Sequence, residues 1–191
     1  MIFYQGKKLE VVLETKLLGV QCSSSGTWHN HVNYMTKQAF MRIYSLRRLK
    51  DIGASEKTLV ETYQLFVRPK IEMCAPLWTG ALLRNKKLTD KINKVQRYVC
   101  RIIRPELPPE LAETVLGLGS LEERRIKMSK KCAENMAADP RFAHLFKPTH
   151  SRNLRRVNKF SEPSWKLYRY GYSSIPFFIR LLNEDKDKKV C

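Results

Sequence analysis

Five basic residues in one segment of the chain recur at helical spacing and could together bind phosphate groups. These residues are Lys87, Lys91, Lys94, Arg97 and Arg101. Residues three and four apart lie on neighbouring turns of a helix, so these side chains fall roughly on one side. Ile92, Val95 and Val99 recur with the same period and predict that another side packs into a core. Because phosphate contacts do not read bases, we expect nucleic-acid binding with little sequence preference.

The alternative for this segment is a solvated outer face, which normally mixes charges of both signs. Residues 84–104 instead contain eight basic residues and one acidic residue, Asp90. Residues 37–50 show the same imbalance, with five basic residues and no acid. We therefore predict that Lys37, Arg47 and Arg48 in this second segment also contact phosphates.

A third basic segment near the carboxyl end is interleaved with aromatic residues. Its basic residues are Arg152, Arg155, Arg156 and Lys159, and its aromatic residues are Trp165, Tyr168, Tyr170 and Tyr172. Such interleaving suits single-stranded RNA or DNA, whose bases stack on aromatic rings. The aromatic residues could equally serve to pin the segment to the rest of the domain. We keep Arg152, Arg155 and Arg156 as candidate nucleic-acid contacts.

The sequence contains no pattern that would bring catalytic groups together. Nucleotide polymerisation needs two metal ions held by converging carboxylates, and the chain contains no Asp-Asp pair. His29 and His31 near Cys22 could bind zinc, but a fourth ligand at a suitable spacing is missing, which favours a packing role. We therefore expect no catalytic residue, no metal ligand and no cofactor in this chain.

The composition supports a polyanionic partner. The 191 residues include 36 Lys and Arg against 18 Asp and Glu, for a formal net charge of +18. Nucleic acid is the leading partner for such an excess, and an anionic membrane surface is the next. The five cysteines contain no C-x-x-C pair and are expected to be reduced thiols. No stretch is apolar enough to predict a membrane span, so we expect the nucleus or the cytoplasm.

The periodicity of apolar residues predicts a mainly α fold, a helical bundle after a short N-terminal β-hairpin. The opening residues are β-prone, and residues 11–20 predict a second strand or pair of strands. Two or three strands cannot bury both faces alone, so this start resembles the edge of a larger sheet. Helical spacing predicts helices over about residues 30–52, 85–104 and 120–136, with Ser55 and Ser120 as N-caps. Trp28 and Trp78 are assigned to packing.

Several short motifs occur in one order along nearly the whole chain. They are LLGVQCSSSGTWHNHV, YSLRRL, YQLFVRPKIEMCAPLW, INKVQRYVCRII and the late SSIPFFIRLLN. In this order they resemble the region after the polymerase palm in non-LTR (LINE-type) retrotransposon reverse transcriptases. The matching positions are Gly19, Trp28, His31, Arg68, Pro69, Pro76, Trp78, Gln96, Arg97, Leu121, Arg124 and Arg125. Met73 and Cys74 depart from the family, in which a more hydrophilic or aromatic pair is common.

The resemblance implies three regions and a role. Residues 1–25 would be the end of the palm with primer-grip-like strands, residues 26–105 a helical thumb, and residues 106–191 a post-thumb region with a basic arm. The chain would be a C-terminal fragment of an RNA-directed DNA polymerase that binds the RNA/DNA template–primer duplex. The catalytic aspartates and their Mg²⁺ would belong to the missing palm, so we expect this chain alone to be inactive. The missing palm and fingers would be its protein partners.

Three other interpretations remain open at the level of sequence. The first is a helical adaptor that docks a protein through residues 177–182 and the exposed sheet edge. The second is a module that binds anionic membrane surfaces. The third is a transposon remnant without function.

Overall fold

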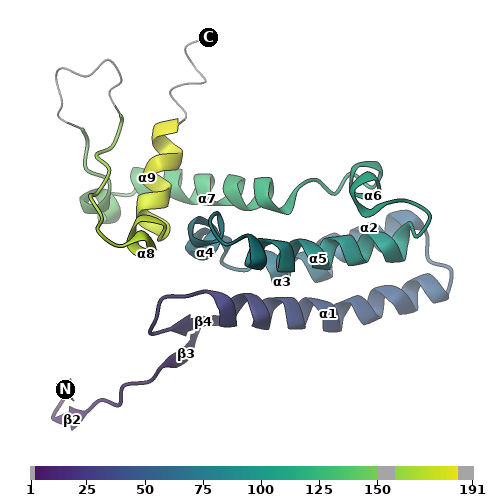
Figure 1. Ribbon diagram of the computed structural model, residues 1–191, viewed down its shortest axis with the longest axis horizontal. Helices are drawn as coiled ribbons and strands as arrows, with labels where there is room; N and C mark the ends of the chain where they lie inside the picture. Colours follow the sequence, from purple (N-terminus) through teal and green to yellow (C-terminus); the bar gives the residue numbers. More distant parts are fainter. Residues whose placement is uncertain (1–2, 150–157, 185–191) are drawn as a thin grey trace.

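The computed structural model describes residues 3–149 and 158–184, and in this part the chain is mainly helical with two small strand pairs near the N-terminus (Figure 1). This confirms the predicted fold class. The candidate contacts Arg152, Arg155 and Arg156 lie outside the described residues.

The N-terminal strands form two hairpins that follow one another. Strand β1 (Phe3–Tyr4) pairs with β2 (Lys7–Lys8), and β3 (Glu14–Leu17) pairs with β4 (Val20–Ser23), both antiparallel. Leu18 and Gly19 have φ values of 47° and 87°, as a tight two-residue hairpin turn requires. Of the two arrangements allowed for residues 11–20, the turn selects the pair of strands. Only Val20 of the predicted apolar set is buried, whereas Leu13 and Leu17 are exposed.

Two long helices carry the predicted basic segments. Helix α1 (His29–Asp51) ends before Gly53, whose φ of 80° ends the helical path. Helix α5 (Lys86–Ile103) begins at Asn85, whose side-chain oxygen accepts a hydrogen bond from the Leu88 amide. The two helices lie side by side (Figure 1) and bury the apolar stripes that the spacing predicted.

A broken helical segment connects α1 to α5. It comprises α2 (Glu56–Thr62), the π-helical turn η1 (Tyr63–Val67), α3 (Arg68–Glu72) and α4 (Ala75–Leu82). Ser55 caps α2 as predicted, through a 3.2 Å hydrogen bond from the Thr58 amide. Pro69 has no amide hydrogen for the preceding turn, which is consistent with the wide turn at η1. Cys74, with a φ of 52°, separates α3 from α4.

The carboxyl-terminal half of the chain folds back over the helices described above. Helix α6 (Pro109–Val115) leads to α7 (Leu121–Ala138), the short turn η2 (Pro140–Leu145), α8 (Tyr168–Gly171) and α9 (Ser174–Glu184). The Ser120 hydroxyl accepts hydrogen bonds from the Glu122 and Glu123 amides, so the predicted cap is confirmed. Helix α9 packs on α7 and α4 (Figure 1).

The apolar side chains form two clusters. The first joins α1 through α6 to the start of α7, and Trp78 is fully buried in it with its indole N–H donating to the Met73 carbonyl at 3.0 Å. The second gathers Phe177, Phe178 and Ile179 of α9 against Ala133 and Phe146. The adaptor interpretation needed residues 177–182 as a free docking patch. That expectation is wrong, because most of this patch is buried inside the chain.

His31 belongs to the first cluster and serves a packing role. Its ring is fully buried between Trp28 and Trp78, with ring centroids 5.8 and 6.1 Å away. Its Nδ1 accepts a hydrogen bond from the Gln21 amide at 3.2 Å, which ties α1 to β4. Burial lowers the pKa of His31 below its ordinary value because the charged imidazolium is desolvated.

Acidification is therefore expected to destabilise the fold through His31. An unfolded histidine titrates near pH 6.5, so the unfolded chain takes up a proton below that pH before the folded chain does. Between pH 7.5 and 5.5 this costs up to about 1.4 kcal/mol of the free energy of unfolding. Urea denaturation at the two pH values measures it.

The control is His31→Asn, whose side-chain oxygen can replace Nδ1 as the acceptor without titrating. We expect the pH dependence of this variant to be smaller than that of the wild type by the same amount. Equal pH dependence of the two proteins would contradict the assignment.

Candidate nucleic-acid interface

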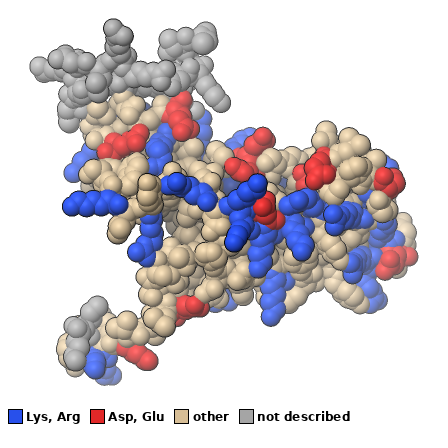
Figure 2. Space-filling model, viewed as in Figure 1, with Lys and Arg blue, Asp and Glu red and all other residues tan. Residues whose placement is uncertain are grey.

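An open groove of about 570 Å³ lies beside α5 and reaches Phe40 of α1. We call it the basic groove, and its lining residues are Phe40, Lys87, Asp90, Lys91, Lys94, Arg97, Tyr98 and Arg101. Figure 2 shows basic side chains gathered over α5 on the face in view, with fewer acidic ones among them. All five basic residues predicted on this helix thus line a single surface.

Aromatic side chains form the floor of the basic groove and set the spacing of its two helices. Phe40 of α1 meets Tyr98 of α5 edge to face, with ring centroids 5.6 Å apart. The Arg47 guanidinium lies over the same Tyr98 ring at 5.1 Å, so a sixth predicted cation lies beside the groove, outside its lining. Lys91 Nζ donates to the Asn33 side-chain oxygen across the helix pair. These contacts hold the cations on a preformed scaffold.

The cations of the basic groove remain available to an external anion. Lys87, Lys91, Lys94 and Arg101 are exposed, and within residues 3–149 and 158–184 none of them forms an ion pair. Asp90 is the acid in the lining. Several like charges on adjacent turns repel one another, and a bound phosphate strand would relieve this repulsion.

Arg97 faces two surfaces. It lines the basic groove and also a smaller recess of about 280 Å³ that contains Glu110 and Glu113. Burial raises the pKa of Glu113, and the nearby positive charge of Arg97 acts in the opposite direction. Part of the Arg97 charge is therefore offset by an acid of the protein itself.

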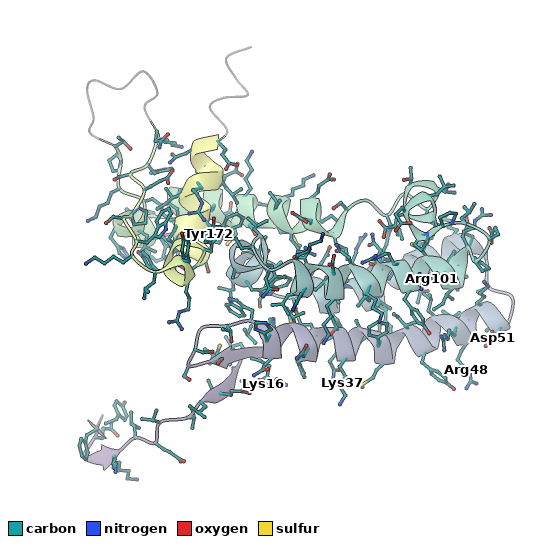
Figure 3. All side chains as sticks on the ribbon, in the orientation of Figure 1. Lys16, Lys37, Arg48, Asp51, Arg101 and Tyr172 are labelled. Carbon is teal, nitrogen blue, oxygen red and sulfur yellow. The ribbon has the colours of Figure 1, made fainter. Side chains whose placement is uncertain are left out.

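Two predicted residues of α1 lie away from the basic groove. Figure 3 shows Lys37 and Arg48 at the edge of α1 remote from α5, whereas Arg101 lies on α5. The Arg48 guanidinium donates to the Tyr44 hydroxyl at 3.2 Å. Lys37 and Arg48 could reach a nucleic acid only if it extended beyond the groove.

A second hollow adjoins the amino-terminal end of α5. It has a volume of about 510 Å³, and we call it the aromatic cleft, with lining residues Gly26, Trp28, Leu77, Ala81, Arg84, Leu167, Tyr168, Arg169, Tyr170, Tyr172, Ser173 and Ser174. The sequence suggested the tyrosines but not Trp28, Leu77 or Arg84 as their neighbours. Arg84 lies over the rings of Tyr168 and Tyr172 at 4.7 and 5.3 Å. The sequence feature that could have indicated this site was Arg84, a basic residue directly before Asn85, the N-cap of α5.

Comparisons of the chain with models of protein families, with curated proteins and with solved structures found no match. The resemblance to reverse transcriptases thus stays a prediction from the sequence motifs. Among the described residues, no helix is long and apolar enough to cross a bilayer. Nor do those residues bring three or more His, Cys, Asp or Glu side chains together in a group suited to a metal ion.

Proposed function

We propose that this chain binds a nucleic-acid duplex along the basic groove, as the thumb and post-thumb part of a non-LTR retrotransposon reverse transcriptase. The duplex in this proposal is the RNA/DNA template–primer. Chemistry is left to a palm that carries the aspartates and their Mg²⁺, so this chain alone is inactive. We propose that the chain functions in the nucleus or the cytoplasm.

The observation that carries the proposal is the row of basic residues along α5, of which Lys87, Lys91, Lys94 and Arg101 are exposed and form no ion pair within the described part of the chain. From Lys87 to Arg101 the helix rises about 21 Å, at roughly 1.5 Å per residue. Phosphates of one strand are spaced about 3.4 Å along a duplex axis, so this length spans about six of them. Five basic residues of α5 and Arg47 of α1 supply a matching number of charges.

A protein partner forms part of the proposal. All four residues of β3 are exposed, and Leu17 at its end and the flanking Leu13 and Leu18 each expose more than half of their surface. Unpaired strand edges with apolar side chains favour pairing with another chain or domain. We assign this surface to the palm and fingers of the polymerase.

The salt dependence of duplex binding tests the proposed function. With six phosphates neutralised, the logarithm of the association constant should fall against the logarithm of salt concentration with a slope of roughly −5. Fluorescence anisotropy with a labelled RNA/DNA duplex between 50 and 200 mM salt measures the slope. An affinity that barely changes over this range would contradict binding through phosphate contacts, and absence of duplex binding would overturn the proposed function.

A further inference from the structure

The aromatic cleft presents ring faces to solvent next to positive charge. Tyr168 is 70 % exposed and Tyr170 is 51 % exposed, although both line a concave site. Arg84 and Arg169 supply charge to the same lining, which contains no Asp or Glu among the described residues. Exposed aromatic rings with arginines among them are a surface on which nucleobases stack and phosphates bind.

The cleft is held open by contacts that fix residues 165–174 to the main body. The Ser174 hydroxyl donates to the Leu77 carbonyl at 3.1 Å, and Arg169 donates to the Ser25 carbonyl. Gly80 lets the chain approach α4 closely: a Cβ there would lie 2.7 Å from the Tyr172 carbonyl oxygen and 2.9 Å from Cβ of Phe177. The backbone that carries the tyrosines is therefore in place before a ligand arrives, which favours binding.

The aromatic cleft and the basic groove both contain basic residues near the amino-terminal end of α5. Arg84 directly precedes Asn85, the cap of α5, and Lys87 of the basic groove follows within one helical turn. Figure 3 shows Tyr172 near the end of the molecule that holds α4, α8 and α9, whereas Arg101 lies toward the far end of α5. A strand that leaves a duplex at the amino-terminal end of α5 would thus meet the cleft next.

From this arrangement we infer that the aromatic cleft binds an unpaired base of the strand that extends from the bound duplex. The inference rests on the proposed function and adds to it a second ligand class, the single-stranded extension. A base stacks on the face of Tyr168, the more exposed of the two rings, and Arg84 and Arg169 contact the flanking phosphates. Stacking tolerates any base, so the cleft selects single strands over duplex ends and not one sequence over another.

The test compares the affinity of the chain for three forms of one RNA/DNA duplex. One form has a blunt end, one carries a four-nucleotide extension on the 5′ side, and one carries it on the 3′ side. An extension of abasic nucleotides keeps the phosphates and removes the bases. We expect one polarity of extension to raise the affinity of the wild-type chain about tenfold over the blunt duplex, as one stacked base provides. The abasic extension should lose most of this gain, and 2-aminopurine in the extension should change its fluorescence on binding.

Variants of Tyr168 separate stacking from packing. Tyr168→Phe keeps the ring face and should keep the gain, whereas Tyr168→Leu keeps apolar bulk and should lose most of it. Tyr4→Ala is the matched control, because Tyr4 is 64 % exposed on the remote β1 hairpin (Figure 1). Circular dichroism melting of each variant confirms that it is folded.

The outcomes distinguish the inference from the proposed function. Equal affinity for blunt and extended duplexes, with steep salt dependence of both, overturns the inference and leaves duplex binding intact. A full gain with the abasic extension, or with Tyr168→Leu, also overturns it. Failure to bind even the blunt duplex overturns both.

Discussion

Replacing Lys87, Lys91, Lys94 and Arg101 together by glutamine is expected to abolish tight duplex binding. Each neutralised phosphate contributes about 0.9 to the salt slope, so the slope should change from roughly −5 to about −1 or −2. At 50 mM salt the loss of four such contacts should weaken binding by at least about 100-fold. Anisotropy titrations of the variant and of the wild type over the same salt series measure both quantities.

A variant with the same loss of charge elsewhere serves as the control. Lys7 and Lys8 of β2 and Lys127 and Lys131 of α7 are exposed and lie on elements away from the basic groove (Figure 1). Their replacement by glutamine lowers the net charge equally, but it should change the salt slope by less than one. If both variants lose affinity alike, binding depends on net charge and the groove has no special part in it.

Gln96→Leu is expected to destabilise the fold. In the folded chain the buried Tyr63 hydroxyl donates to Gln96 Oε1 at 2.8 Å, and Gln96 Nε2 donates to the Gly119 carbonyl at 2.9 Å. Leucine leaves the Tyr63 hydroxyl buried without an acceptor, which costs about 2–3 kcal/mol of the free energy of unfolding. Denaturation in urea, followed by circular dichroism, measures the loss.

The double variant Gln96→Leu with Tyr63→Phe checks the cause. Removing both polar partners should restore part of the lost stability, because the unpaired hydroxyl is then absent. Gly119 is exposed, so its carbonyl can accept a hydrogen bond from water in both variants. If the double variant is as unstable as the sum of the single ones, the hydrogen bond is not the reason.

The helical part of the fold could be predicted because local rules determine it. The apolar stripe of α5 repeats over five turns, and its start is marked by Asn85, so its bounds were close to those predicted. The apolar stripe of α1 and the Ser120 cap of α7 were predicted from the same local rules. The spacing that placed Lys87 to Arg101 on one side of α5 follows from the same helical geometry.

The parts that the sequence left open depend on contacts between distant residues. Residues 11–20 are apolar and β-prone, and a sharp turn at Leu18 and Gly19 cannot be separated from a continuous strand by period alone. The burial of residues 177–182 requires a partner surface on α7 and α4, about 50 and 100 residues earlier in the chain. Likewise, Arg84 and Tyr168 meet only after the chain has folded back over α4.

The close contact at Gly80 affects how far the aromatic cleft lies from the basic groove. The backbone of residue 172 rests directly on α4, and no side chain lies between them. The separation between the backbone of α4 and the backbone that carries the tyrosines is therefore set by a main-chain contact. Ions in solution weaken charge-based contacts but leave such a steric contact unchanged. The two proposed surfaces therefore keep the same backbone separation at every salt concentration, although the binding of a strand to them weakens as salt rises.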